Sequence, residues 1–275
     1  MPDIVIHVVA SAAYVGLAWH FWRTRWRLAA APERRTAGSG LQGWERAAIL
    51  APLALHGWLL YDRTFAAPEL RLGFAQALSV MMFLGVTLYW VESLFYGLEG
   101  LEPLILPLAA LAVPLPALFA GRGIDVQTAQ FKVHFALAMI AYSLFTIALL
   151  HATLMAIAER RLHRKHAKFA VNLPPLLTLE QSLFRVIGIA FVFLTLTLAT
   201  GMALTDSMFG RLLRFNHETV FAIMSWVTFA ALLLGRYAYG WRGRTALRWT
   251  IAGFVMVVLA NVGTAFVLEV VLDRT

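Results

Sequence analysis

The chain has 275 residues, of which 60% are hydrophobic and only 14% are charged, and its mean hydropathy is +0.73. Soluble domains are about 45–50% apolar and about 25% charged, so the composition excludes an ordinary soluble protein. The chain has no cysteine, which excludes disulfides, CxxC redox chemistry, thiolate ligation of haem and iron–sulfur clusters. The net charge of +8 comes from short basic segments with no continuous stripe and no aromatic stacking platform, which argues against a nucleic-acid partner.

The apolar residues form blocks of the length that a helix needs to cross about 30 Å of hydrocarbon. We predict an all-α fold: one polytopic membrane domain, residues 1–275, with about eight transmembrane helices in the lipid bilayer. The first block lacks a basic leader and stays apolar to Phe21, which is typical of an uncleaved span rather than a signal peptide. The predicted spans are 3–21, 45–62, 73–91, 103–120, 131–157, 182–203, 219–238 and 249–270.

The distribution of Lys and Arg predicts the orientation of the bundle. Fifteen Lys and Arg residues lie in or next to the segments that follow the first, third, fifth and seventh spans. Seven lie in or next to the segments on the opposite side. Because basic residues accumulate in cytoplasmic loops, both termini are expected on the non-cytoplasmic side.

Two segments have local signals of their own. The fourth span contains prolines at positions 103, 107, 114 and 116, which predict a bent helix. Residues 204–218, "LTDSMFGRLLRFNHE", are expected to form an outer loop along the bilayer surface. In that segment Asn216 is expected to cap the seventh span, while Arg211 and Arg214 meet headgroups or the carboxylates of a ligand.

Three histidines are predicted to converge in the outer leaflet: His56 in the second span, His134 in the first turn of the fifth, and His217 at the start of the seventh. Ionisable groups at membrane depth often mark function, and neutral imidazoles on facing helices can hold haem iron. Each one alone could instead make a hydrogen bond between helices. His7, His20 and His151 are interpreted as packing or interface residues. The sequence has no HExxH, GxSxG or P-loop motif, so no bond-making enzyme is expected.

At 132–150, "KVHFALAMIAYSLFTIALL", at 173–202 and at 217–249 the chain resembles the cytochrome c assembly, or haem-handling, family of membrane proteins of the CcsA, ResC and CcmC type. It is most similar to the small inner-membrane branch typified by YpjD. The resemblance implies a multi-pass protein of the bacterial inner (cytoplasmic) membrane. It also implies haem as the cofactor, bound near the outer surface between histidines that flank a tryptophan-rich segment.

By position, the resemblance implies that His134 matches the histidine before that segment and that His56 matches a histidine on a haem route. The chain departs from the family pattern in its outer loop, because residues 204–218 contain no tryptophan. Gly235 also stands where larger members often have a histidine. A bis-histidine site would therefore use His217 or His56 opposite His134, with Arg211 or Arg214 pairing the propionates.

Three functions remain open from the sequence. The first is haem handling with cytochrome c maturation partners. The second is a transporter-like or accessory subunit in divalent-cation homeostasis that works with a cation-transport partner, which the resemblance to the small branch suggests. The third is a structural partner that kept the fold and lost haem.

Overall fold

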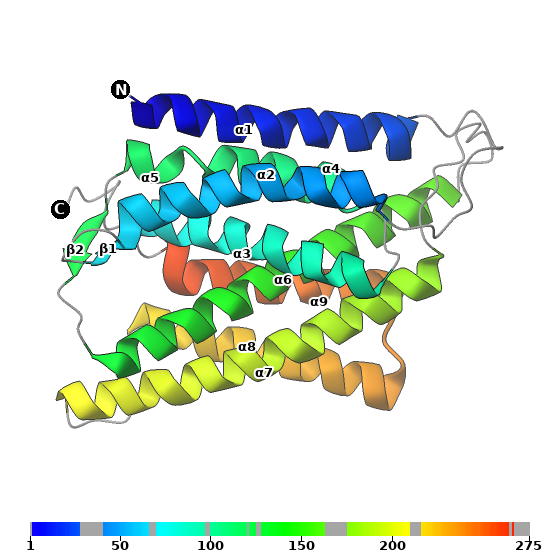
Figure 1. Ribbon diagram of the computed structural model, residues 1–275. Helices are drawn as coiled ribbons and strands as arrows, with labels where there is room; N and C mark the ends of the chain where they lie inside the picture. Colours follow the sequence, from blue (N-terminus) through cyan, green and yellow to red (C-terminus); the bar gives the residue numbers. More distant parts are fainter. Residues whose placement is uncertain are drawn as a thin grey trace.

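A computed structural model gives the architecture, and it describes residues 2–27, 41–65, 70–96, 100–119, 121–124, 128–162, 175–209, 216–263 and 266. Figure 1 shows helices that run roughly side by side, with α1 along one edge of the bundle and α7 along the other. The elements in chain order are α1 (Pro2–Phe21), α2 (Gly43–Leu60), β1 (Leu70–Leu72), α3 (Phe74–Phe95), α4 (Glu102–Ala112), α5 (Leu115–Leu118), β2 (Arg122–Ile124), α6 (Ala129–Leu162), α7 (Leu176–Phe209), α8 (His217–Tyr239) and α9 (Gly243–Val258). Short π-helical turns extend α1, α2 and α9 over Trp22–Arg27, Tyr61–Phe65 and Leu259–Gly263.

Each predicted span coincides with a helix or a helix pair, which confirms the polytopic helical fold. Among the described residues, five helices are long and apolar enough to cross a membrane by themselves: α1 with its π turn, α3, α6, α7 and α8. The apolar helix Glu102–Leu118 is shorter. The second predicted span coincides with α2, and the eighth coincides with α9 and its π turn as far as Gly263; of the rest of that span only residue 266 is among the described residues.

The two ends of the bundle differ in the segments that they bring together (Figure 1). We call the end that holds the starts of α1, α6 and α8 the outer end. The inner end holds the π turn after α1, the start of α2 and the turn between α8 and α9. The charge distribution predicts that the inner end faces the cytoplasm.

The centre of the bundle is formed by α3 and α6. In each of these helices 61% of the most apolar stretch is buried, against 22–28% in α1, α7 and α8. Between the two central helices the Ser143 hydroxyl donates a hydrogen bond to the Met81 carbonyl at 3.0 Å. Phe145 of α6 stacks on Phe229 of α8 with ring centroids 3.9 Å apart. Without a hydrophobic force between helices in lipid, such packing and hydrogen bonds hold the bundle together.

The prolines of the fourth span break its helix instead of only bending it. Pro103 lies in the first turn of α4, where its missing N–H is harmless. α4 then ends at Ala112, and α5 starts at Leu115 after Pro114. The predicted bend is thus a break at Val113–Pro114.

A two-stranded antiparallel sheet at the outer end was not predicted. β1 pairs with β2 in the register Leu70 to Ile124 and Leu72 to Arg122. Gly121, which precedes β2, has φ +67°, and a Cβ there would lie 2.7 Å from Gln76 Oε1. The sheet therefore joins the α2–α3 connection to the α5–α6 connection. Only glycine fits at position 121 beside it.

α7 is longer than the sequence analysis expected. The predicted outer loop 204–218 is wrong over 204–209, because the helix continues to Phe209. No proline or glycine interrupts it there, and the Thr205 hydroxyl is satisfied by the Gly201 carbonyl at 2.9 Å. A helix forms its backbone hydrogen bonds within itself, so it can continue into the headgroup layer without leaving backbone groups unpaired.

We predict that Gly253→Ala destabilises the protein whereas Gly188→Ala does not. A Cβ at Gly253 would lie 2.6 Å from Phe229 Cζ, whereas a Cβ at Gly188 would meet no other atom within 4 Å. Overpacking costs about 1–3 kcal/mol, and an unhindered helical Gly→Ala change gains about 0.5–1 kcal/mol. Thermal unfolding of both variants in detergent measures the difference, and equal melting temperatures would contradict the packing described for α8 and α9.

Candidate functional site

His56 lies in the bundle interior between α1 and α3. Its side chain is fully buried, and its Nε2 lies 2.9 Å from the Ser79 hydroxyl. Its Nδ1 lies 3.5 Å from the Tyr14 hydroxyl. The rings of Tyr14 and Phe83 pack edge-on against the imidazole. Both nitrogens of His56 are therefore occupied by neighbours on other helices.

His134 lies near the outer end, where α6 packs against α7. Its Nδ1 lies 3.0 Å from the Thr200 hydroxyl oxygen. That hydroxyl also lies 2.8 Å from the Leu196 carbonyl and 3.1 Å from the Thr197 carbonyl, which can take its single hydrogen and leave its oxygen to accept from the imidazole. When the hydroxyl hydrogen is on a carbonyl of α7, Nδ1–H donates to Thr200 and Nε2 keeps its lone pair. The lone pair at Nε2 is the form that binds a metal ion.

The backbone of α7 leaves space for the His134 ring. A Cβ at Gly201 would lie 3.1 Å from His134 Cε1. Because Gly201 has no side chain, the imidazole can lie directly against α7 beside Thr200. A glycine and a threonine in adjacent positions thus place the His134 ring and give its Nδ1 a hydrogen-bond partner.

His217 is the first residue of α8 and is exposed. The predicted cap is confirmed, because the Asn216 side chain accepts a hydrogen bond from the Thr219 N–H at 2.9 Å. Glu218 lies in the first turn, where a negative charge is favourable. Arg211 and Arg214 lie outside the described residues.

The three predicted ligands do not touch one another. His56 contacts residues of α1 and α3, His134 contacts α7, and His217 has no side-chain partner within the described ranges. No group of three or more His, Asp or Glu side chains suited to a metal ion occurs in the described part of the chain. The starts of α6 and α8 and the end of α7 do lie at the same, outer end of the bundle (Figure 1). Of the three histidines, His134 and His217 therefore share an end and a group of packed helices.

A buried ionic cluster at the inner end was not identified from the sequence. Arg25, in the π turn after α1, donates to Glu45 of α2 at 2.8 Å and to Glu102 of α4 at 3.3 Å. All three side chains are at most 2% exposed. Backbone N–H groups of Gln42 and Gly100 donate to the same two carboxylates, at 2.8 and 2.7 Å. The cluster therefore joins α1, α2 and α4 with charges that have hydrogen-bond partners.

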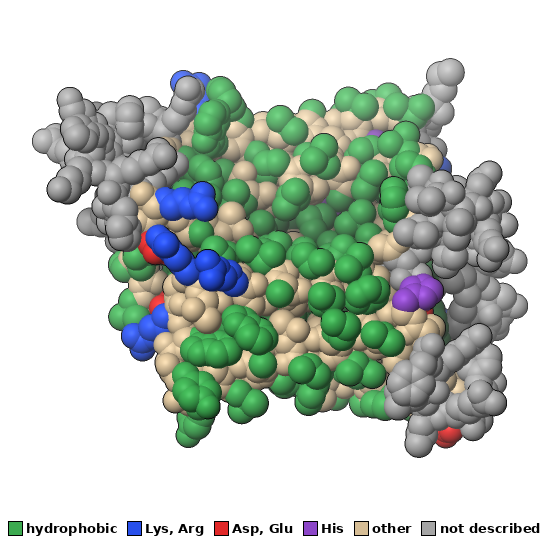
Figure 2. Space-filling view, turned by 180° about the vertical axis from the view of Figure 1, so that it is seen from behind, with side chains coloured by type: hydrophobic (Ala, Val, Ile, Leu, Met, Phe, Trp, Pro, Cys, Tyr) green, Lys and Arg blue, Asp and Glu red, His purple; other side chains and the backbone are tan. Residues whose placement is uncertain are grey.

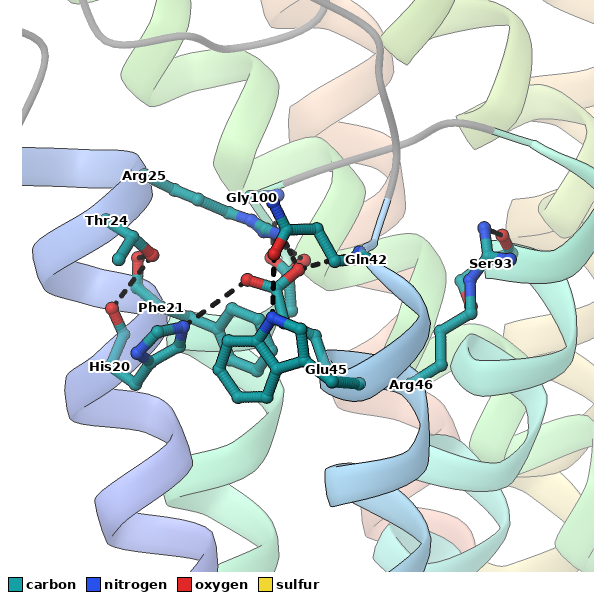
Figure 3. Close-up of polar contacts among 11 residues, drawn as sticks. His20, Phe21, Thr24, Arg25, Gln42, Glu45, Arg46, Ser93 and Gly100 are labelled. Carbon is teal, nitrogen blue, oxygen red and sulfur yellow. Dashed lines mark hydrogen bonds and ion pairs between the residues drawn. The ribbon is translucent and has the colours of Figure 1, made fainter. Parts of the chain in front are cut away.

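His20 extends this cluster toward the surface. Figure 3 shows His20 and Arg25 of the α1 segment directed at Glu45, which lies at the start of α2. His20 Nε2 lies 3.3 Å from Glu45 Oε1. Nearby, Arg46 donates to the Ser93 carbonyl at 3.0 Å and ties α2 to α3. His20 thus has a structural partner, as its interpretation as an interface residue requires.

A second buried pair lies between α3 and α6. His151 is fully buried, and its Nε2 lies 3.7 Å from Glu92 Oε1. Its Nδ1 lies 3.0 Å from the Ile147 carbonyl one turn earlier, and an imidazole can approach a carbonyl only with an N–H. Two residues are too few to hold a metal ion by themselves, so this pair is better explained as packing between the central helices.

A family model and several related proteins point to the same protein family for this chain. Residues 47–272 match the family model described as "Cytochrome C assembly protein". The inner membrane protein YpjD of Escherichia coli (strain K12) is 33% identical over 139 residues, which is 50% of this chain and 52% of the relative. The chain thus spans about half the length of that curated relative.

Two further relatives extend the comparison. A 28.8 kDa protein of Azospirillum brasilense, named for its place in a nifR3-like 5′ region, is 30% identical over 255 residues, 88% of this chain and 92% of the relative. The cytochrome c biogenesis protein CcsA of Prochlorococcus marinus (strain MIT 9303) is 29% identical over 94 residues, 34% of this chain and 30% of the relative. No solved structure matches the chain.

We predict that Arg25→Met destabilises the protein strongly, whereas Arg23→Met, two residues earlier and exposed, does not. Removal of one partner from a buried ion pair costs about 3–5 kcal/mol, because the remaining charge is left in the interior. Adding Glu102→Gln to Arg25→Met should recover part of the loss. Unfolding in detergent measures the three variants, and equal stability of the two single variants would show that the cluster is not essential.

Proposed function

Because the chain belongs to the cytochrome c assembly protein family, we propose that it handles haem at the outer end of the bundle, with His134 as an iron ligand. The single observation that carries the proposal is the hydrogen bond from His134 Nδ1 to Thr200, which leaves Nε2 available. A ligating histidine usually donates its other ring N–H to a neighbour, and that bond fixes the ring and raises its basicity. The residues at this position would therefore suit an imidazole that holds haem iron.

The second ligand proposed is His217. It is exposed at the start of α8, and its imidazole forms no hydrogen bond or ion pair with a side chain of the described ranges. α8 packs against α7, which also carries Thr200 and Gly201. Arg211 and Arg214 would pair the propionates, which is a proposal from the sequence alone.

His56 is the less suitable second ligand. It would have to give up its contacts with Ser79 and Tyr14 and leave a fully buried position. Loss of a buried hydrogen bond costs about 1–3 kcal/mol for each group left without a partner. We propose instead that His56 holds α1, α2 and α3 together.

The proposed role is binding and presentation, because none of the residues described here forms a bond-making catalytic set. Haem, when bound, supplies the iron. The chain supplies an oriented imidazole at His134, a helix start at His217 and an apolar bundle around them. Cytochrome c maturation proteins would be the partners that accept the cofactor.

We predict that protein purified after expression with ample haem shows a Soret band that His134→Ala abolishes. Thr200→Val should lower haem affinity by about 10–100-fold, because it removes the hydrogen bond that orients the ring. His217→Ala should leave a band of five-coordinate, high-spin type. Absorbance titration with haem in detergent measures all three.

The matched control is His56→Gln, which keeps a polar group between Ser79 and Tyr14 and should retain the full band. If His56→Gln loses haem and His134→Ala keeps it, His56 is the ligand and the proposal is wrong. Native protein without a Soret band would exclude haem binding at this site. Metal sensitivity of a deletion strain with normal c-type cytochromes would then favour the role in cation homeostasis.

A further inference from the structure

A basic cavity lies at the inner end, on the opposite side of the membrane from the proposed haem site. Its volume is about 360 Å³, and it opens between the last turns of α6 and the first turns of α9. We call it the inner basic pocket. It is lined by Ala156, Glu159, Arg160, Arg244, Leu247 and Arg248.

The charges in the inner basic pocket are unbalanced. Three arginines face one glutamate, and Arg244 Nε already lies 3.3 Å from Glu159 Oε1. Arg160 and Arg248 are exposed and make no ion pair with any residue in the described ranges. Their guanidinium groups are therefore free to bind an anion, and guanidinium binds phosphate oxygens in a two-point geometry.

Neighbouring arginines show what a balanced site looks like at this end. Arg236 and Arg242 share Glu180 as their partner, with nitrogen–oxygen distances of 2.6 and 3.4 Å. Those two cations already have a carboxylate. Arg160 and Arg248 differ from them, because neither has a carboxylate partner among the described residues.

Aromatic side chains fix the depth of the pocket in the membrane. Tyr237 and Tyr239, at the end of α8, are 92% and 80% exposed. Trp241 and Trp249 lie beside each other with ring centroids 5.1 Å apart. Exposed Tyr and Trp gather at the headgroup level of a bilayer. Because α9 starts just after Trp241, we expect the arginines of the pocket at the level of lipid phosphates.

One face of α9 carries charged side chains near the start of the helix and apolar side chains farther along. Arg244, Arg248, Ile251 and Val255 follow one another at spacings of four, three and four, which places them on one face of the helix. Ile251 and Val255 are 43% and 45% exposed. On the face of the bundle that Figure 2 draws, basic side chains gather at one end and hydrophobic side chains cover the middle. An anionic head at the arginines would place a hydrocarbon tail along Ile251 and Val255.

We propose that the inner basic pocket binds the phosphodiester of an anionic phospholipid. Arg160 and Arg248 contact the phosphate, and the acyl chain lies on the apolar part of the α9 face. A soluble phosphate would contact the same guanidinium groups, but it has no hydrocarbon chain to lie on Ile251 and Val255. The amphiphilic order along α9 therefore favours the lipid.

The test compares phosphatidylglycerol with phosphatidylcholine as probes on the purified full chain in detergent. Native protein should bind phosphatidylglycerol in preference, measured by native mass spectrometry at equal lipid concentrations. Arg160→Gln/Arg248→Gln should reduce that preference about tenfold or more, because two charge-assisted contacts are lost. The control Arg23→Gln/Arg71→Gln removes the same charge from exposed positions outside the pocket and should leave the preference unchanged.

Further measurements distinguish the source of the phosphate. Ile251→Ser/Val255→Ser should weaken phosphatidylglycerol binding and leave binding of inorganic phosphate unchanged. If inorganic phosphate displaces the lipid at equal concentration and the serine variant binds lipid normally, the ligand is soluble and the proposal is wrong. Equal loss of preference in the pocket variant and the control would show only a general effect of charge, which also overturns it. Haem absorbance of the pocket variant is expected to stay native, so failure here is separate from failure of the haem proposal.

Discussion

The fold depends on how the buried guanidinium of Arg25 is neutralised. A charge in a membrane bundle is costly unless it is paired and fully hydrogen-bonded, and Arg25 has two carboxylates, which are themselves held by backbone N–H groups. The pairing needs the ends of α1, α2 and α4 to meet at one point. Buried ion pairs are weak sources of stability but strong constraints on arrangement, so the cluster selects which helix ends are neighbours.

The ion pairs are distributed unequally between the two ends of the bundle. Within the described residues, all of them except Asp62–Arg63 lie at the inner end or in the inner half. The outer end is held by the short β1–β2 pairing, by neutral hydrogen bonds such as His134–Thr200 and by packing. A rigid inner end and a less constrained outer end suit a protein whose proposed ligand would be received and released at the outer side.

Hydropathy predicted the helical fold because each span must satisfy its own backbone in lipid, which makes a continuous apolar block a reliable signal. His134 could be chosen as a candidate site residue from the sequence, because ionisable side chains are rare at membrane depth. Its partner Thr200 could not be predicted, because it lies 66 residues away and threonine is common in spans. The pairing of Arg25 with Glu102 spans 77 residues. Charge at a span edge was counted only as a signal of orientation, and the sequence does not show that Arg25, in the π turn, is buried. The three-residue strands are too short to give an alternating pattern.

The lengths of α6 and α7 affect the lipid around the protein. Each has 34 residues and is therefore about 51 Å long, whereas the hydrocarbon layer is about 30 Å thick. Even a strong tilt leaves both helices longer than the acyl region, so their ends reach among the headgroups. His134, in the second turn of α6, then lies where water, headgroups and acyl chains meet. An amphiphile with a flat apolar ring and charged side arms could reach that boundary by sideways diffusion in the outer leaflet, without an aqueous channel through the bundle.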